Sequence, residues 1–371
     1  MCKIFKKILD TYCILYTMSN ASCQFIYQLR CLTEKEDISM TTKKILFVLV
    51  GVVFMGSLVL GAVAQAQEFT IRIAHTHTEK GLYYKGSVKF KELVEERSGG
   101  RIVVEHYPAG QLGADRDIQE GVQLGTIEAG LSSSPVVLLN DYFKLLDAPY
   151  LFVDREHVTK VLDGELGQKM AKPLEEVGIK HLGYLENGFR QITNNVRPIV
   201  VPEDLEGIKL RTPESPVRMQ TFKTFGANPV PMSFTEVFGA LQQGIIDGQE
   251  NPLATIYQAS LHEVQKYLSL TGHVYSAVHL LMNKDLFDSM PEDLQNILVE
   301  AGREVAVYTR ELGAENDASL ADVMANEGVE VNQADVKAFV AKAKVVWPMI
   351  IEDCKYEDAA EVVDQIAAMA E

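Results

Sequence analysis

The stretch from Glu186 to Pro252 constrains the fold most, because signals for strands, turns and helices follow one another at short intervals. Seven of the chain's 13 prolines lie in it, and proline fixes the backbone angle φ, so the segment is a series of rigid turns. Ser215 followed by proline predicts a helix start, and Gly226 predicts the end of that helix. A Ser-x-x-Glu capping box at Ser233 predicts the next helix. This order is typical of a repeating βα unit.

Three polar side chains stand where strands of this stretch are predicted to end. Arg190 follows an apolar run and a predicted turn at Gly188. Arg211 ends a strand predicted over 208–211, and Asn251 precedes a proline at a predicted helix start. An open α/β sheet binds ligands just beyond the carboxyl ends of its strands, where loops and helix N-termini supply donors. We therefore expect a binding site built from these junctions.

The rest of the chain alternates between strand and helix patterns, which predicts an α/β fold with a mostly parallel sheet and helices on its faces. Two further helical runs are expected to end the chain. The main predicted strands span 68–74, 101–107, 127–131 and 274–282, and the main predicted helices span 82–97, 115–124, 154–178 and 291–325.

The first 66 residues have the pattern of an export signal. Met40 is followed by two lysines, an apolar run over 45–64 and an Ala-Gln-Ala site, which predicts a signal peptide over 40–66, cleavage after Ala66 and a periplasmic protein. Residues 1–39 are interpreted as a spurious extension upstream of the true start, with a cytoplasmic tail as the alternative. The apolar run is also long enough for an uncleaved membrane anchor.

Charge and cysteine content exclude several classes of function. The net charge is −16, and residues 1–66 hold seven basic and four acidic side chains, so the remainder is at about −19. This charge argues against nucleic acid and anionic membranes as partners, and an anion site must be built locally from arginine. Cys354 alone follows Ala66, so no disulfide or cysteine zinc site is expected there. His75 and His77 lack a third nearby ligand, and no metal is predicted.

The segments GFRQITNN, RTPESP, GANPVPMSFTEVFGALQQGIIDGQENP and HEVQKYLSLTGH resemble the periplasmic solute-binding proteins of tripartite ATP-independent periplasmic (TRAP) transporters, in particular the C4-dicarboxylate-binding, DctP-like family. The resemblance covers about 300 residues. It implies a two-domain periplasmic binding protein fold, type II-like, with hinge strands and a long domain-spanning helix. The implied domains are 67–187 plus 277–316 (domain I) and 188–276 plus 317–371 (domain II).

The resemblance also implies how the ligand is held. Arg211 matches the arginine that clamps a carboxylate, because its planar guanidinium can grip both oxygens. Arg190 matches a second donor to that carboxylate, Asn251 an amide contact and Phe234 an aromatic wall. The residues alone leave other roles open. Arg211 could form a surface ion pair, and Arg190 could be a solvated loop residue. Asn251 could cap a helix, and Phe234 could lie in the core.

Four further residues are candidate ligand contacts. Ser133 lies in a strand-to-helix junction that faces the ligand in the resembled family, while the serine after it has the alternative of a helix cap. Glu186 and Asn187 precede the predicted turn before Arg190 and are expected to bind ligand hydroxyls. Thr76 follows the first strand and is expected at the pocket rim.

The leading interpretation is a non-enzymatic receptor that closes on a small carboxylate and delivers it to the TRAP membrane permease. The ligand is expected to be a sugar acid such as a uronate, or a C4-dicarboxylate. No cofactor and no catalytic residue are expected. The protein is expected to be a monomer. One alternative is a periplasmic sensor for a membrane kinase, which a different partner would distinguish. The other is a periplasmic enzyme, for which no G-x-S-x-G, P-loop, G-x-G-x-x-G or H-E-x-x-H motif is present.

Overall fold

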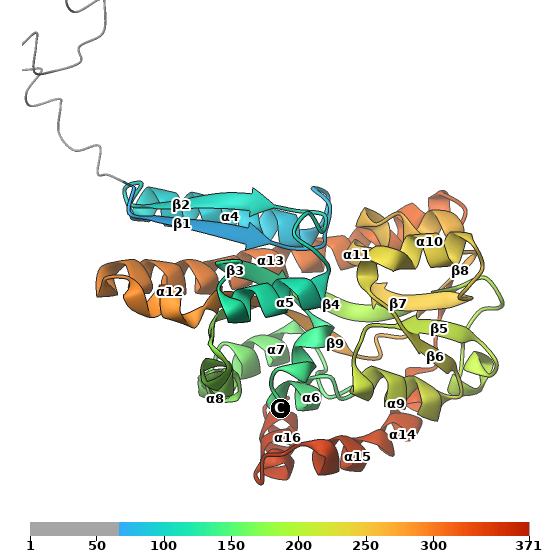
Figure 1. Ribbon diagram of the computed structural model, residues 1–371. Helices are drawn as coiled ribbons and strands as arrows, with labels where there is room; N and C mark the ends of the chain where they lie inside the picture. Colours follow the sequence, from blue (N-terminus) through green and yellow to red (C-terminus); the bar gives the residue numbers. More distant parts are fainter. Residues whose placement is uncertain (1–66, 371) are drawn as a thin grey trace, which may run out of the picture. The chain divides into compact units, whose positions relative to one another are not determined.

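Ten strands form one mixed sheet in this computed structural model, which describes residues 67–370 (Figure 1). The main path has the order β2-β1-β3-β9-β4-β7-β5-β6, with β8 paired to β4 and β10 to β8. The predicted extension over 1–39 and the predicted signal peptide over 40–66 lie outside the described residues. The strands are β1 (Phe69–Ala74), β2 (Ile102–Tyr107), β3 (Ala129–Ser132), β4 (Ile179–Asn194), β5 (Lys209–Thr212), β6 (Asn228–Pro231), β7 (Gly248–Pro252), β8 (Tyr267–Leu270), β9 (Tyr275–Asn283) and β10 (Glu330–Gln333).

The sheet has two halves, which share β4. In the first, β1 is parallel to β2 and β3, and β9 is antiparallel to β3 and to the first part of β4. In the second, β5 is parallel to β6 and β7, while the last part of β4 is antiparallel to β7 and β8. We call the half with β1, β2, β3 and β9 the first lobe, and the half with β5 to β8 and β10 the second lobe. Because β4 runs through both, it links the lobes directly.

Helices cover the sheet, and the longest, α13, contacts both lobes: it packs on β4 and α4 and reaches α11 and β10. Its 35 residues confirm the long helix predicted over 291–325. None of the helices within residues 67–370 is long and apolar enough to cross a membrane. The α-helices are α4 (Leu82–Arg97), α5 (Asp115–Leu124), α6 (Tyr142–Leu146), α7 (Arg155–Leu162), α8 (Glu165–Ala171), α9 (Pro216–Phe225), α10 (Val237–Gln242), α11 (Leu253–Gln258), α12 (Lys284–Ser289), α13 (Glu292–Asn326), α14 (Val336–Ala343), α15 (Val346–Asp353) and α16 (Ala359–Ala368).

Short 3-10 helices connect several of these elements: η1 (Ser134–Leu138), η2 (Lys172–Val177), η3 (Pro202–Leu205), η4 (Phe234–Glu236) and η5 (Leu261–Val264). The predicted start and end of α9 are confirmed, because the Ser215 hydroxyl accepts a hydrogen bond from the Arg218 amide and Gly226 adopts a left-handed conformation. The capping box predicted at Ser233 is wrong: its hydroxyl pairs with the Thr235 hydroxyl instead, and the α-helix begins later, at Val237.

The structure also corrects the turn predicted before Arg190. β4 is one continuous strand of 16 residues, and the register with β9 shifts between Glu186 and Gly188. Gly188 has a φ of 119°, which glycine adopts without steric cost, so the strand bends at this point without ending. Arg190 therefore lies inside a strand shared by both lobes.

The end of the chain packs differently from the expectation. Three helices rather than two close the chain, and side chains of α15 and α16 such as Ile350 and Val362 belong to the same buried cluster as Phe143 and Met170 of the first lobe. Phe339 of α14 packs in the second lobe. The assignment of all of 317–371 to domain II thus does not match this packing, because α16 packs on the first lobe and α15 contacts both α6 and α9. The remaining domain boundaries stay a prediction.

Two glycines let β4 and α13 approach at backbone distance. A Cβ atom on Gly302 would lie 2.3 Å from the Leu182 carbonyl oxygen, and one on Gly183 would lie 3.0 Å from the Gly302 carbonyl oxygen. We predict that Gly302→Ala lowers the melting temperature and destabilises the fold by about 1–3 kcal/mol, because neither backbone can move away cheaply. The control is Gly239→Ala in α10, where the new methyl group meets no atom closer than 3.9 Å and helix propensity rises. Equal melting temperatures for the two variants would contradict the prediction.

A buried histidine pair predicts loss of stability in mild acid. His279 of β9 is buried, and its Nδ1 lies 3.2 Å from Nε2 of His181. Burial lowers the pKa of His181 to about 3 and that of His279 well below its ordinary value. The unfolded chain therefore takes up protons first as the pH falls below about 6.5, and each such histidine costs about 1.4 kcal/mol per pH unit.

We expect His279→Gln to flatten the decline in unfolding free energy between pH 6.5 and 5.0 by up to about 2 kcal/mol. Chemical denaturation at several pH values measures this slope. Comparing the two slopes removes any effect of the substitution that does not depend on pH. That effect is measured at pH 8, where the histidine is neutral in the folded and in the unfolded chain. A variant that declines as steeply as the wild type would disprove the role of this pair.

Candidate functional site

A cavity lies between the two lobes, at the carboxyl ends of β1, β3, β5 and β6. The hollow spans about 440 Å³, which includes space open to solvent. Its walls carry polar, charged and aromatic side chains. The lining residues are Thr76, His77, Tyr83, Asp115, Ser133, Ser134, Pro135, Asn187, Arg190, Arg211, Pro213, Glu214, Met232, Ser233, Phe234, Asn251 and Thr255.

Seven of the eight residues singled out from the sequence line this cavity, and they come from six different elements or loops. Their ligand-binding roles remain predictions, but the fold brings them together from positions up to 175 residues apart in the chain. The seven are Thr76, Ser133, Asn187, Arg190, Arg211, Phe234 and Asn251.

Glu186 is the exception, and its expected contact with ligand hydroxyls is corrected. Its carboxylate accepts hydrogen bonds from Arg155 Nη2 at 2.9 Å and from the Tyr275 hydroxyl at 2.6 Å. Its side chain also packs against Gly313 of α13, where a Cβ would lie 2.6 Å from the Glu186 Cγ. Glu186 therefore faces the long helix and not the cavity.

Arg211 enters the cavity from the end of β5. Its Nε and Nη2 atoms donate to the Met232 carbonyl oxygen at 2.9 and 2.6 Å, which fixes the plane of the guanidinium. Within residues 67–370, its Nη1 has no hydrogen-bond partner. Burial, together with the positive charge of Arg190, lowers the pKa of Arg211 to about 10. The nearby negative charge therefore does not fully stabilise the charged guanidinium. A bound anion would supply that stabilisation.

Arg190 is held from behind by Glu250. Its Nε lies 2.5 Å from Oε2 and its Nη2 2.8 Å from Oε1, and both side chains are almost fully buried. The Glu250 carbonyl oxygen accepts a further hydrogen bond from Nη2. This geometry fixes the guanidinium at the cavity wall and partly neutralises it.

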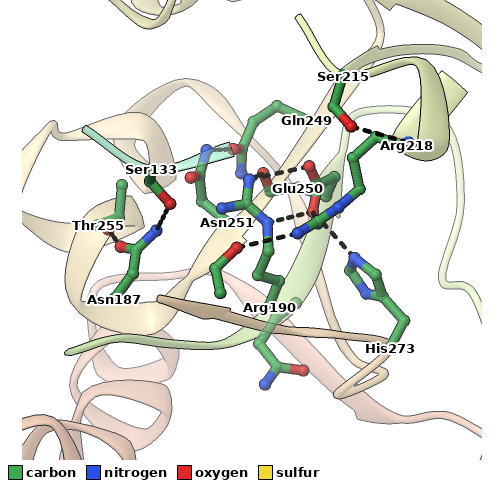
Figure 2. Close-up of polar contacts among 12 residues, drawn as sticks. Ser133, Asn187, Arg190, Ser215, Arg218, Gln249, Glu250, Asn251, Thr255 and His273 are labelled. Atoms are coloured by element: carbon green, nitrogen blue, oxygen red, sulfur yellow. Dashed lines mark hydrogen bonds and ion pairs between the residues drawn. The ribbon is translucent and has the colours of Figure 1, made fainter. Parts of the chain in front are cut away.

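The Glu250 carboxylate also contacts the side chains of Arg218 and His273, as Figure 2 shows. Arg218 Nη1 lies 3.1 Å and His273 Nε2 2.9 Å from Oε2. Arg218 also pairs with Asp147 at 2.7 Å. The arginines and the His273 hydrogen bond outweigh the cost of burial and hold the pKa of Glu250 far below its usual range.

A chain of neutral polar groups forms another part of the wall (Figure 2). The Thr255 hydroxyl donates to Asn187 Oδ1 at 3.0 Å, and Asn187 Nδ2 donates to the Ser133 hydroxyl at 3.3 Å. Ser133 in turn donates to the Ala277 carbonyl oxygen at 2.8 Å. Asn251 donates to Gln249 Oε1 at 2.6 Å, which fixes its amide. Such groups can exchange hydrogen bonds with hydroxyls of a ligand.

Aromatic rings close the side of the cavity that faces β1. His77 stacks on Tyr83 with ring centroids 3.5 Å apart, and Phe234 lies 5.6 Å from His77. Burial, with smaller contributions from His75 and Arg190, holds the pKa of His77 well below its usual range. His77 is therefore neutral at pH 7 and adds no charge to the wall.

Several lining residues are not predicted by the sequence patterns, and among them Asp115 has the clearest chemistry. It stands at the first position of α5, where a helix start had been predicted, and an acidic residue at such a junction was the available signal. The Glu250 partners Arg218 and His273 carried no comparable signal, because they approach from α9 and from the segment between β8 and β9.

Within residues 67–370, no group of three or more histidine, cysteine, aspartate or glutamate side chains is placed to bind a metal ion. His75 does not face His77; its Nε2 lies 2.8 Å from Nε2 of His106.

Two α/β lobes joined by a shared strand and a long helix, with an arginine-bearing cavity between them, define a solute-binding protein. The model of the bacterial extracellular solute-binding proteins, family 7 (DctP), matches residues 73–353. The chain belongs to this family, the substrate receptors of TRAP transporters, and the expected two-domain periplasmic binding protein fold is thereby confirmed.

Relatives with known ligands cover most of the chain. The 2,3-diketo-L-gulonate-binding periplasmic protein YiaO of Escherichia coli is 38% identical over 301 residues, which are 80% of this chain and 92% of that protein. The C4-dicarboxylate-binding periplasmic protein DctP of Rhodobacter capsulatus is 33% identical over 337 residues, 89% of this chain and 98% of that one. A crystal structure of a TRAP periplasmic solute-binding protein from Polaromonas sp. JS666, bound to D-erythronate, has a TM-score of 0.78 and 35% identity, and covers 81% of this chain and 99% of that chain.

The Glu250 network yields a stability prediction. Glu250→Gln leaves two buried arginines without their shared anion, and we expect a loss of about 3–5 kcal/mol of unfolding free energy. The control is Glu203→Gln, which breaks an exposed pair with Lys342 and should cost less than about 1 kcal/mol. Denaturant unfolding at pH 7 measures both. Similar losses for the two variants would show that the buried network contributes no more than a surface pair.

Proposed function

We propose that this protein is the extracytoplasmic receptor of a TRAP transporter, that it binds a small organic anion in the cavity between its lobes, and that it is not an enzyme. The observation that carries the proposal is the buried guanidinium of Arg211, which lines the cavity, donates to one backbone oxygen and, within residues 67–370, has no hydrogen-bond partner for Nη1. A carboxylate fits this donor, and Arg190, which lines the same cavity, is the second donor to that carboxylate. The ligand is a sugar acid or a C4-dicarboxylate, as named for the relatives.

Contacts between the two lobes support enclosure of the ligand between them. Thr78, after β1, donates from its amide and its hydroxyl to Gln258 Oε1 at the end of α11, at 3.0 and 2.8 Å. Arg116 of α5 pairs with Glu214 beyond β5 at 3.6 Å. Each contact joins a first-lobe element to a second-lobe element. Enclosure removes water from the anion and strengthens its hydrogen bonds with arginine.

Family membership supports the steps that follow binding. The mature protein starts after Ala66, works in the periplasm as a monomer and presents its closed form to the TRAP membrane permease. Hinge motion along β4 would open the lobes for release, because this strand belongs to both halves of the sheet.

A binding experiment tests the arginine clamp. We predict that Arg211→Ala weakens carboxylate binding by about 2–5 kcal/mol, roughly thirtyfold or more, because it removes a buried charge-assisted donor. Arg211→Lys should also bind weakly, since a single ammonium cannot copy the fork of donors. Isothermal titration and thermal shift of residues 67–371 against aldonates, uronates, 2-oxo acids and dicarboxylates provide the readout.

Arg303→Lys is the matched control, because Arg303 is exposed on α13 and outside the cavity lining. A ligand at 1,000 times its dissociation constant should stabilise the wild type and this control by about 4 kcal/mol. If no carboxylate stabilises the wild type, or if Arg211→Ala binds as the wild type does, the proposed function is wrong.

A further inference from the structure

Four charged side chains line the cavity, two of each sign: Asp115, Arg190, Arg211 and Glu214. Arg190 is already paired with Glu250 behind it, and Glu214 faces Arg116 at 3.6 Å near the mouth. The cavity therefore has cationic donors for one carboxylate group, at the Arg211 end. Among its lining residues no further arginine or lysine stands ready for a second carboxylate.

Asp115 is the acid in this wall that lacks a cationic partner. It lies at the first position of α5, and within residues 67–370 it forms no ion pair. The Thr76 hydroxyl donates to Oδ2 at 3.4 Å and the Ser132 hydroxyl to Oδ1 at 3.3 Å, and both distances are long for O–H···O hydrogen bonds. Burial raises the pKa of Asp115, and the opposing effects of the Ser132 hydroxyl and the Arg211 charge do not cancel this rise. A ligand group that donates hydrogen bonds would satisfy it.

We propose, building on the anion-receptor function above, that Asp115 selects monocarboxylic acids that carry several hydroxyls and excludes dicarboxylates. One end of such an acid binds Arg211 through its carboxylate. A hydroxyl further along the ligand donates to Asp115, and others exchange hydrogen bonds with the neutral wall of Ser133, Asn187 and Thr255.

A dicarboxylate meets a different environment with its second end. Its second carboxylate has no hydrogen to donate to Asp115, and it adds a further negative charge to a cavity whose lining already carries the carboxylates of Asp115 and Glu214. Like charges in a cavity from which water is excluded repel strongly, and a buried carboxylate without a partner is costly. Specificity thus arises from a repulsive element as well as from attraction.

The test compares two acids with four carbon atoms, D-erythronate and succinate, and also L-galactonate as a longer hydroxy acid. Isothermal titration with the wild type should give at least tenfold tighter binding for the better of the two hydroxy acids than for succinate. Asp115→Asn keeps the size of the side chain and removes its charge, and we expect it to reduce this ratio at least fivefold. Glu120→Gln removes an exposed charge from the same helix outside the cavity and should leave the ratio unchanged.

Failure of this inference is distinct from failure of the proposed function. Succinate binding the wild type within tenfold of both hydroxy acids, or more tightly, overturns the selectivity, and so does a ratio in Asp115→Asn that changes less than fivefold. In either case, loss of binding in Arg211→Ala still supports the receptor. The wild-type comparison needs no variant, so it decides the selectivity even where Asp115→Asn does not fold.

Discussion

The buried carboxylate of Glu250 is the interaction on which the cavity depends. It receives hydrogen bonds from Arg190 of β4, Arg218 of α9 and His273, so three separate segments converge on one strand, β7. Buried cations require such an anion, because the cost of removing them from water is recovered only by close pairing. Without this pairing, Arg190 could not remain at the cavity wall in a fixed orientation.

Arg190 and Arg218 pair with carboxylates, whereas Arg211, within residues 67–370, donates only to a backbone oxygen. Burial penalises its charge, and the residual positive charge of Arg190 adds to that penalty. Arg211 thus has no carboxylate paired to it, although the protein as a whole carries a net charge of −16. Long-range repulsion of a small anion is screened by salt within about 8–10 Å, whereas contacts inside a closed cavity are screened much less.

The order of the elements could be predicted from local patterns, and the candidate cavity residues from strand-end junctions together with the family resemblance. Period-two alternation, Ser215 before a proline and Gly226 act over a few residues, and the structure confirms them. The sequence pattern predicts a turn at Gly188 where the structure has a bend, because one glycine with positive φ can bend a strand as well as end it. The packing of α16 on the first lobe depends on contacts about 200 residues apart, which no local pattern encodes.

Side-chain direction along β7 explains why Asn251 could be predicted as a cavity residue, whereas the role of the neighbouring Glu250 in the charge network could not be predicted. On β7, successive residues face opposite sides of the sheet, so Gln249 and Asn251 share one face, where their amides bond to each other, while Glu250 points to the other. Which face meets the cavity is set by the register with β4, in which Gln191 pairs with Asn251. A shift of one residue would exchange the amide and the carboxylate. The ligand site and the charge network behind it therefore depend on a single register, established only when the two strands pair.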